Sequence, residues 1–377
     1  MKIPILHNIE RLIKKIRVRI KYSHVLIAQN IAFKKNFGKC KKLIVFVNFA
    51  DNEFCGGVMS IFYLAEASRQ MKEIHGCDVL NANFINTEGR YYLKQKRFKN
   101  NETMYRFKQI ISHAKHLDTL ILHVPEMMMS DFALLLTPKY RKQLKKIPNL
   151  QINVLNQNIE VFSPVETWSN LRELTDNITQ TTGFDKYTNQ EACDKFGLPL
   201  YRLIGYNRLH EKYTKTEIKD KEKLFLYSID VTEQTEIILK ILKEGLPDFK
   251  FQQIKGITFD EFMDLNKKAL FSITFGEGFD GYFTNIHFLG GIGFTVFNET
   301  FFPSKKFLEF PNVYESYEQL GKNIVKDVKY YMENPNDYME LSEKVRALNV
   351  ETAYNEKLTI DLLEKFYKKE PTFLPQK

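Results

Sequence analysis

Runs of β-branched and aromatic residues alternate with helical segments along most of this chain, and that alternation restricts the fold more than any other feature. Residues 43–47 (Leu-Ile-Val-Phe-Val) form a continuous apolar run typical of a buried parallel strand. Strands that alternate with helices pack as a parallel sheet covered on both faces. The first half therefore indicates a doubly wound α/β domain ending near residue 200, with strands at 43–47, 78–81, 119–124 and 151–156 and helices at about 58–72, 101–116 and 138–146.

A second α/β cycle follows the charged stretch 210–223, which is expected to be a linker or surface segment. Within this cycle, Thr258 and Glu261 have the spacing of a capping box at the start of a helix. A chain of 377 residues is long enough for two domains, each with its own core. The elements expected here are strands at 224–227, 249–254, 270–275 and 294–297 and helices at about 233–244, 259–268, 316–333, 338–348 and 355–368.

Composition narrows the classes of partner. The net charge of +9 implies an anionic partner. No sequence pattern of an RNA-recognition sheet, a helix-turn-helix or a zinc finger is present, so we expect a phosphate-bearing substrate or a membrane surface and no nucleic acid. No apolar run approaches the ~20 residues of a membrane span, and no signal peptide is evident, so a cytoplasmic location is expected. Without CxxC pairs, the four cysteines are expected to be reduced structural thiols.

The segment 5–21 is expected to form a basic amphipathic helix. Its apolar residues recur at spacings of three and four, which places them on one helical face: Ile5, Ile9, Leu12, Ile13, Ile16 and Ile20. Basic residues fill much of the remainder: Arg11, Lys14, Lys15, Arg17, Arg19 and Lys21. Such a helix can lie on an anionic membrane, which would make the protein peripheral on the inner face of the plasma membrane. The alternative is a helix packed on the body with a solvated basic face.

The stretch 271–298, FSITFGEGFDGYFTNIHFLGGIGFTVFN, carries the strongest indication of a ligand site. A strand that ends in Gly276-Glu277-Gly278 delivers one carboxylate to the carboxyl edge of a parallel sheet, where open α/β sheets bind ligands. The later glycines, Gly290, Gly291 and Gly293, are expected to bring backbone N–H groups close to a ligand, as phosphate sites require. The alternative is a buried βαβ unit with glycine turns.

Polar residues also follow the expected strands of the first domain. Gly56 and Gly57 open a helix after the first strand, where an anion or a sugar can approach the backbone, although no GxGxxG motif is present. His123 and Glu126 follow a buried strand and are expected to reach the inter-domain cleft at the ligand-binding edge, whereas the alternative for His123 is a hydrogen-bonded core histidine. Asn156 ends another strand and could hydrogen-bond sugar hydroxyls or simply build a turn.

Three runs resemble the C-terminal half of GT-B glycosyltransferases, and more closely the retaining "glycosyltransferase group 1" or GT4-like enzymes. These are 254–262 (IKGITFDEF), 269–273 (ALFSI) and Glu277-Gly278-Phe279. The run 293–297 (GFTVF) is similar to the family's final Gly-x-Pro-Val-Val element, and Gly56-Gly57 is similar to its N-terminal glycine-rich loop. The resemblance covers residues 41–370 in architecture and about 40 residues in recognisable motif.

The resemblance implies two Rossmann-like doubly wound domains that face each other across a cleft. It implies a metal-independent, retaining, hexosyltransferase-type enzyme that moves a sugar from a nucleotide-sugar donor to a glycan or lipid-linked acceptor in bacterial surface polysaccharide synthesis (capsule, lipopolysaccharide O-antigen). The nucleotide-sugar is then a substrate, and no cofactor is expected. The implied division is 1–40, a basic amphipathic segment; 41–205, the acceptor domain; 206–350, the nucleotide-sugar domain; and 351–377, a helix that packs back on the first domain.

The chain departs from the family's pattern in two places. The family's paired glutamates lie eight positions apart, and the position eight after Glu277 is Asn285, which keeps a hydrogen-bonding group but no charge. The family also places an Arg and a Lys after the first strand of the second domain, whereas residues 228–233 contain no basic residue. Groups that could meet the diphosphate instead are Lys255, Arg208 and Lys212, or the amides of Gly290, Gly291 and Gly293. No D-x-D triplet occurs, so no metal site is expected.

The candidate site residues fall into three groups: catalytic, donor-side and acceptor-side. The catalytic candidates are Glu277 and His123, and Gly276, Gly278, Phe279 and Asn285 are expected near the donor; Gly56, Gly57, Glu126 and Asn156 are expected on the acceptor side. Two other function classes stay open at this point. One is a non-catalytic GT-B-like subunit that binds glycans or scaffolds another transferase. The other is a sugar-phosphate or nucleotide-binding isomerase of similar fold, for which no motif is present.

Overall fold

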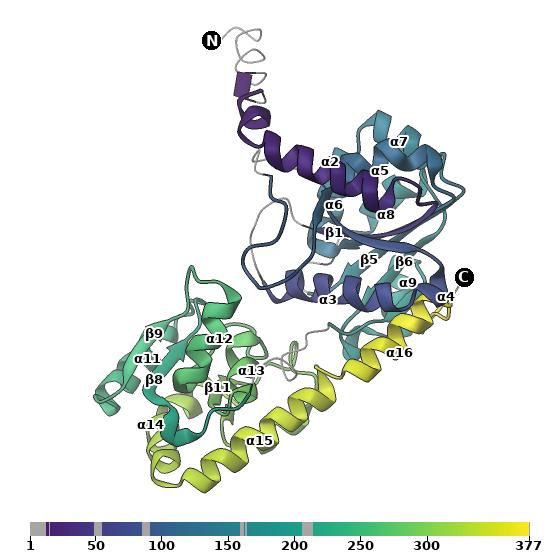
Figure 1. The fold of residues 1–377 in the computed structure, drawn as a ribbon. Helices are drawn as coiled ribbons and strands as arrows, with labels where there is room; N and C mark the ends of the chain where they lie inside the picture. Colours follow the sequence, from purple (N-terminus) through teal and green to yellow (C-terminus); the bar gives the residue numbers. More distant parts are fainter. Residues whose placement is uncertain are drawn as a thin grey trace, which may run out of the picture. The chain divides into compact units, whose positions relative to one another are not determined.

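The computed structural model describes residues 13–14, 16–48, 55–84, 91–158, 162, 164–205 and 214–376. The chain divides into two compact units, which we call unit 1 (residues 1–206 and 357–377) and unit 2 (residues 207–356) (Figure 1). Each unit contains one parallel sheet with helices packed against it. This architecture confirms the predicted α/β class with two Rossmann-like, doubly wound sheets.

The sheet of unit 1 has seven strands in the order β3-β2-β1-β4-β5-β6-β7. Every neighbouring pair is parallel, and β1 pairs with both β2 and β4. The chain therefore winds outward from β1 in both directions, and the order reverses between β1 and β4. The strands are β1 (Lys42–Asn48), β2 (Asp78–Asn83), β3 (Met104–Arg106), β4 (Thr119–Pro125), β5 (Asn149–Asn156), β6 (Ile178–Thr182) and β7 (Leu200–Arg202).

Side chains of β1 alternate between two cores, one on each face of this sheet. Leu43 and Val45 face one core with α5 and α6, whereas Ile44 and Phe46 face the other with α3 and α16. This alternation follows from the two-residue period of a strand. The helices of unit 1 are α2 (Ser23–Phe37), α3 (Gly56–Gln70), α4 (Lys72–His75), α5 (Phe107–His113), α6 (Glu126–Leu135), α7 (Pro138–Leu144), α8 (Val165–Arg172), α9 (Gln190–Phe196) and α16 (Glu356–Tyr367).

The C-terminal segment packs on unit 1. Leu363 and Phe366 of α16 are almost fully buried in the core that contains Phe46. The hydroxyl of Tyr367 is 2.6 Å from that of Ser68 on α3, and the amide of Leu200 donates to the carbonyl of Phe373 at 3.0 Å. Because burial of one large apolar side chain stabilises a fold by about 1.5–3 kcal/mol, α16 is an integral part of the core of unit 1.

The sheet of unit 2 has five parallel strands in the order β12-β11-β10-β8-β9. Its core is rich in phenylalanine, with Phe225, Phe271 and Phe294 on three adjacent strands. The strands are β8 (Glu222–Tyr227), β9 (Lys250–Gln253), β10 (Ala269–Ile273), β11 (Ile292–Val296) and β12 (Val313–Tyr314). The helices are α11 (Thr235–Gly245), α12 (Phe259–Lys268), α13 (Gly281–Phe288), α14 (Tyr317–Glu333) and α15 (Pro335–Thr352).

Local sequence signals located the helix starts of unit 2 well. The capping box is confirmed, because Thr258 N–H donates to Glu261 Oε2 at 2.7 Å and Glu261 N–H donates to Thr258 Oγ1 at 3.3 Å. In unit 1 the predicted helix 101–116 was wrong in its first part, since residues 104–106 form the edge strand β3 beside β2. Strands β6 and β7 were not predicted. The sequence of β6, ITQTT, is polar, yet all of its residues are buried within the sheet, where β6 pairs with β5 and β7.

Among the helices that the structure describes, none combines the length and the hydropathy that a membrane span requires.

Candidate functional site

Glu277 lies in the turn that joins β10 to α13, at the carboxyl edge of the sheet of unit 2. Strand β8, the neighbour of β10, ends at the same edge, so Asp230 follows it there. Glu277 is partly exposed, between the exposed Gly276 and the buried Gly278. In open α/β sheets this edge is where ligands bind.

The two glycines beside Glu277 cannot be replaced without a clash. A Cβ atom at Gly276 would lie 2.8 Å from the carboxyl carbon of Asp230. Gly278 has a φ of 82°, and a Cβ atom there would lie 2.6 Å from the carbonyl oxygen of Val296. The hydroxyl of Thr295 also donates to the carbonyl of Gly278 at 2.9 Å. Gly278 is therefore required by its positive φ and by the nearby carbonyl, whereas the clash at Gly276 is with the end of a flexible side chain.

Two residues of unit 2 support this turn and were missed by the sequence analysis. The hydroxyl of Tyr317, at the start of α14, donates to the carbonyl of Phe275 at 2.8 Å. The amide of Phe275 in turn donates to the hydroxyl of Ser228 at 3.2 Å. No local pattern distinguishes Tyr317 from the other tyrosines of the chain, because its partner lies 42 residues earlier in the sequence.

Asp280 caps α13. Its Oδ1 accepts hydrogen bonds from the amides of Tyr282 (2.8 Å) and Phe283 (3.1 Å), and its Oδ2 accepts one from the hydroxyl of Thr274 (2.5 Å). Burial, together with the nearby carboxylate of Asp230, raises the pKa of Asp280 to about 6. Its carboxylate therefore satisfies free amides of the first helical turn.

The carboxyl edge of unit 2 is consequently rich in carboxylates. Asp230, Glu277 and Asp280 all lie there, but the described residues contain no group of His, Cys, Asp and Glu that could hold a metal ion. Lys255 is exposed in the loop after β9, the strand next to β8. The other two cations considered for the diphosphate, Arg208 and Lys212, lie outside the described residues.

The prediction that Gly290, Gly291 and Gly293 present amides to a diphosphate is wrong. Helix α13 runs back across the sheet, so these glycines lie at the amino end of β11, the edge opposite Glu277. Their amides are already bonded to the helix: Gly290 N–H to His287 O (3.3 Å), Gly291 N–H to Ile286 O (3.0 Å) and Gly293 N–H to His287 Nε2 (3.2 Å).

These glycines permit close packing instead. A Cβ atom at Gly293 would lie 2.5 Å from the carbonyl oxygen of Phe283, and one at Gly291 would lie 2.5 Å from Ile286 Cγ1. Gly290 has a φ of 76°, and a Cβ atom there would lie 2.8 Å from the carbonyl oxygen of Thr216. The glycine cluster therefore serves the αβ turn, which was the alternative interpretation of this stretch.

Phe279 and Asn285 take different places around α13. The ring of Phe279 packs against Phe302 and Phe307, with centroids 5.3 Å apart in both pairs, so it anchors the turn in the core. Asn285 is buried one turn into α13, and its Nδ2 would be 3.1 Å from a Cβ atom at Gly281. The amide of Asn285 therefore lies beside the first residue of α13, in the half of the helix nearer to Glu277.

Unit 1 brings its predicted residues together at the carboxyl edge of its own sheet. Gly57, in the first turn of α3, has its carbonyl bonded by Gln157 Nε2 at 3.2 Å, and a Cβ atom there would lie 2.9 Å from Gln157 Oε1. A Cβ atom at Gly56 would meet nothing within 4 Å. Gln157 directly follows Asn156, the last residue of β5, which is buried.

Glu126 lies at the same edge. It begins α6 directly after β4, and its Oε1 accepts a hydrogen bond from the amide of Asn158 at 2.8 Å. Burial raises the pKa of Glu126. The carboxyl edge of unit 1 thus joins the ends of β4 and β5 to the start of α3 through the hydrogen bonds of Glu126 and Gln157.

The prediction that His123 reaches a ligand-binding edge is wrong. His123 is fully buried in β4, where its ring stacks on Phe46 with centroids 4.4 Å apart and lies 5.1 Å from the ring of Phe366. Burial lowers its pKa to about 3, so the imidazole is neutral at physiological pH, and Asn153 Nδ2 lies 3.1 Å from its Nδ1. The residue points to the sheet face that α16 covers, which is the core alternative for this histidine.

The sequence comparisons give no relative, whereas comparisons of structure do. No family model matches the chain, and no curated protein matches it in sequence. An alpha-glucosyltransferase in complex with UDP and a 13-mer DNA containing an HMU base has a TM-score of 0.59 at 9% identity, covering 87% of this chain and 99% of that chain. A second structure of an alpha-glucosyltransferase with UDP and such DNA has a TM-score of 0.56 at 12% identity, covering 86% and 99%.

A third similar structure is described as trehalose-6-phosphate from E. coli bound with UDP-2-fluoro glucose. Its TM-score is 0.51 at 10% identity, covering 89% of this chain and all of that chain. Together with the two parallel sheets, these likenesses show that the chain has a GT-B fold like that of glycosyltransferases. At such low identity they establish the fold alone.

Proposed function

We propose that this protein is a glycosyltransferase that moves a sugar from a nucleotide-sugar donor to a glycan or lipid-linked acceptor. The observation that carries the proposal is the position of Glu277, a carboxylate at the carboxyl edge of unit 2 directly before Gly278, whose backbone conformation requires glycine. The GT-B fold supports it, because the similar structures named above were determined with UDP or a UDP-sugar bound.

In this proposal unit 2 binds the donor, with Glu277 at the sugar and Asn285 near the nucleotide ribose. Lys255, Arg208 and Lys212 supply the positive charge for the diphosphate, since the glycine amides are excluded by their position. Unit 1 binds the acceptor near Gly56, Gly57, Glu126 and Asn156. Rate enhancement then comes from orientation of the acceptor hydroxyl and from stabilisation of charge on the leaving diphosphate, which takes up the acceptor proton.

The finer assignments belong to the same proposal. The reaction is retaining and independent of metal, the acceptor belongs to bacterial surface polysaccharide synthesis, and the protein works in the cytoplasm, peripheral on the inner face of the membrane. Addition of EDTA should leave turnover unchanged, and the anomeric configuration of the product, read by NMR, decides between retention and inversion.

A binding screen followed by an activity assay tests the proposal. Thermal unfolding is measured with UDP-, GDP- and CMP-sugars, because a ligand that binds only the folded state raises the melting temperature. One donor class should give a saturable shift of several degrees, and Glu277→Gln should then abolish release of the nucleoside diphosphate from that donor. The absence of a shift with every nucleotide-sugar and with the free nucleotides would overturn the assignment.

One observation favours a second candidate, a non-catalytic GT-B-like subunit that binds glycans. Asp230, Glu277 and Asp280 make the carboxyl edge of unit 2 acidic, and residues 228–233 lack the basic pair that the resemblance to GT4-like enzymes implies. A diphosphate would be repelled by this edge unless other cations compensate. Binding of a glycan array without any stabilisation by nucleotide-sugars would favour this candidate over the enzyme.

A further inference from the structure

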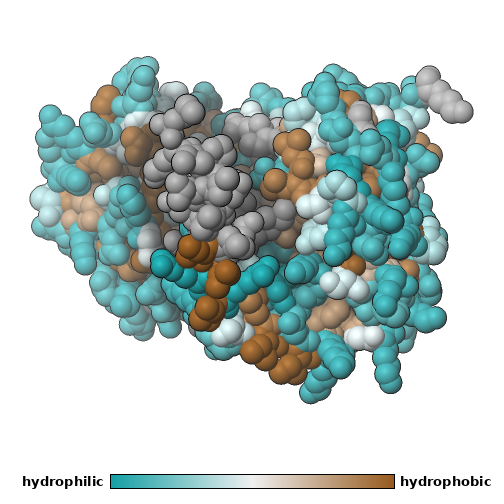
Figure 2. All heavy atoms as spheres, turned by 90° about the horizontal axis from the view of Figure 1, so that it is seen from above, coloured by the Kyte–Doolittle hydropathy of each residue, from teal (hydrophilic) through white to brown (hydrophobic). Residues whose placement is uncertain are grey.

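Helix α2 and the helical residues before it carry a stripe of exposed isoleucines. Within α2, Ile27 is 57% exposed and Ile31 is 64% exposed, and Ile20 just before it is 70% exposed. Spacings of seven and four residues place these side chains on one face, together with the exposed Ile13 and Ile16. Figure 2 shows apolar atoms near the centre of this view and below it, with hydrophilic atoms on either side. We call the five exposed residues Ile13, Ile16, Ile20, Ile27 and Ile31 the isoleucine stripe.

The other face of α2 holds the helix on unit 1. Phe33 is buried against Tyr105 and His113, and Gln29 donates to the carbonyl of Met104 at 2.6 Å. Helix α2 is therefore already packed on unit 1 through its opposite side, and the isoleucine stripe is not needed for that packing. Isolated exposed apolar residues are ordinary, but five exposed isoleucines on one helical face, interrupted only at His24, indicate a surface that contacts an apolar partner.

Positive charge surrounds the isoleucine stripe. The sequence contains no Asp or Glu between Glu10 and Asp51. In the same interval the described residues include Lys14, Arg17, Arg19, Lys21, Lys34, Lys35, Lys39, Lys41 and Lys42. A helix with an apolar face and cationic flanks complements an anionic lipid surface, since the isoleucines can enter the acyl boundary while the cations meet the headgroups.

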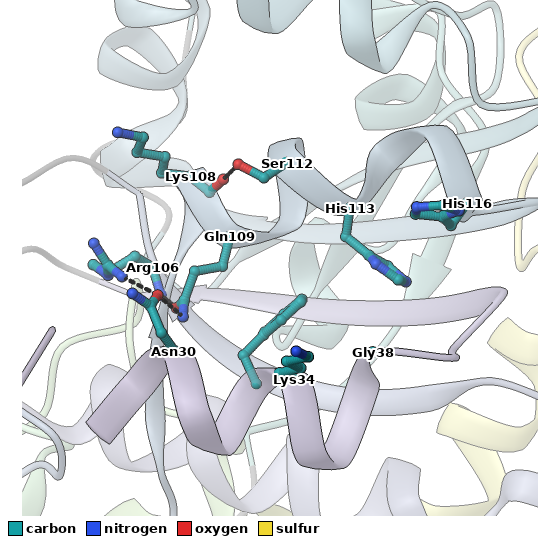
Figure 3. Close-up of a pocket in the computed structure, with 10 residues that line it drawn as sticks. Asn30, Lys34, Gly38, Arg106, Lys108, Gln109, Ser112, His113 and His116 are labelled. Atoms are coloured by element: carbon teal, nitrogen blue, oxygen red, sulfur yellow. Dashed lines mark hydrogen bonds between the residues drawn. The ribbon is translucent and has the colours of Figure 1, made fainter. Parts of the chain in front are cut away.

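A basic pocket of about 400 Å³ opens on the flank of this stripe, between α2 and α5 (Figure 3). Asn30 and Lys34 of α2 line one side, and Arg106, Gln109 and His113 line the other. Lys34 lies about one helical turn after Ile31, and Asn30 directly precedes Ile31. One edge of the pocket therefore adjoins the stripe. The described residues that line the pocket include no Asp or Glu, so the pocket has the charge for a phosphate group and ample room for one.

Arg106 is prepared for an anion. Its Nη2 donates to Asn30 Oδ1 at 2.6 Å, and Gln109 Nε2 donates to the same oxygen at 3.0 Å, as drawn in Figure 3. Its Nε is buried and donates to no acceptor within the described part of the chain, and no carboxylate there forms an ion pair with it. Burial lowers the pKa of Arg106, which remains charged. Arg106 lines the pocket, so its guanidinium can donate a charge-assisted hydrogen bond to a bound oxyanion without competition from a carboxylate of the described residues.

We propose that this pocket binds the phosphate of an anionic phospholipid headgroup while the isoleucine stripe lies in the membrane interface. The inference rests on the peripheral membrane location proposed above and makes it specific: one lipid phosphate is held by Arg106 and Lys34 at a defined site. A free phosphate would have no use for the adjoining stripe, and a nucleic acid would leave five isoleucines in water. A phospholipid satisfies both surfaces at once.

Vesicle binding by the full chain tests the proposal. The wild-type protein should cosediment with mixed phosphatidylcholine and phosphatidylglycerol vesicles and not with phosphatidylcholine alone. Lys34 and Lys35 are exposed neighbours on α2, and only Lys34 lines the pocket. Diffuse attraction to a charged surface predicts that alanine at either position weakens binding about equally, by about fivefold. The pocket predicts about fivefold for Lys35→Ala and at least tenfold for both Lys34→Ala and Arg106→Gln.

Three further results keep the test decisive. Ile20→Ser combined with Ile27→Ser should abolish sedimentation while the melting temperature stays near that of the wild type. Equal losses of vesicle binding in Lys34→Ala and Lys35→Ala would overturn the phosphate site in the pocket. Diffuse electrostatic attraction to the membrane surface would then explain the binding. Tighter binding of inorganic phosphate or duplex DNA than of the vesicles, with the same loss in Lys34→Ala, would overturn the lipid as ligand. Lys34 lies outside the proposed donor site, so Lys34→Ala should turn over nucleotide-sugar and a water-soluble acceptor at the wild-type rate. A wild-type protein that turns over this substrate pair but does not bind vesicles would overturn the lipid site alone. A wild-type protein without turnover would overturn the proposed function.

Discussion

The turns at the two ends of α13 share a composition and differ in what their glycines do. At the carboxyl edge, Gly276 and Gly278 hold Glu277 where its carboxylate remains partly exposed. At the amino edge, Gly290 and Gly293 let α13 pack against the start of β11, and their amides are bonded internally. A glycine run therefore indicates a ligand site only when the edge of the sheet on which it lies is known.

The largest effect is expected at the carboxyl edge. Glu277→Gln keeps the size and the hydrogen bonding of the side chain but removes its charge. If the carboxylate contacts the donor sugar, turnover should fall by about 10²–10³, the range seen when one stabilising group is removed from an active site. The melting temperature should change little, because the side chain is partly exposed. A matched control is Glu340→Gln, an exposed carboxylate on α15. Equal activity in both variants would remove Glu277 from the site.

Alanine at the amino-edge glycines should damage the fold instead. At Gly290 the positive φ and the carbonyl of Thr216, and at Gly293 the carbonyl of Phe283, leave no room for a methyl group. Either substitution should lower the free energy of unfolding by about 1–3 kcal/mol, as overpacking typically does. Donor affinity of the folded fraction, measured by calorimetry below the melting temperature, should match that of the wild type. A specific loss of donor binding with unchanged stability would reinstate the phosphate role of these glycines.

The pH dependence of stability should report Asp280, the cap at the carboxyl-edge end of α13. Its pKa in the folded state, about 6, lies above the usual value of 3.8, so the folded protein binds more protons between these pH values. The contribution is therefore present below about pH 4 and is lost as the pH rises to 6, with a slope of at most about 1.4 kcal/mol per pH unit. Urea unfolding of the wild type and of Asp280→Asn at pH 4, 5, 6 and 7 measures this difference. Parallel profiles for the two proteins would show that Asp280 is not the titrating group.

The smallest effect is expected at Lys255. If this exposed cation meets the diphosphate in place of the glycine amides, Lys255→Ala should weaken donor affinity by about fivefold, since an exposed ion pair contributes at most about 1 kcal/mol. The loss should shrink as salt is added, because the charge is open to solvent. Lys267→Ala, at the far end of α12, serves as the control. An unchanged donor affinity would direct attention to Arg208 and Lys212.

The outcome at His123 illustrates the limit of strand-end reasoning. The predicted position of His123 near the end of a strand is correct. A strand side chain points to one of the two faces of the sheet, however, and His123 points to the face covered by α16. That helix begins 233 residues later in the chain, at Glu356, so no local pattern can predict this contact. Glu126, three residues on, begins a helix and remains at the edge.

The sequence by itself determined the class of fold, most strands, the helix starts of unit 2 and the βα turn that carries Glu277. Continuous β-branched runs, helical periodicity, the Thr258 capping box and the Gly-Glu-Gly turn act over a few residues, so they can be recognised without a partner. The tertiary structure decided which edge each glycine run occupies, which face covers His123, which polar strands such as β6 are buried and where Arg106 meets Asn30. These outcomes depend on contacts between residues far apart in the chain, and short-range patterns hold no information about them.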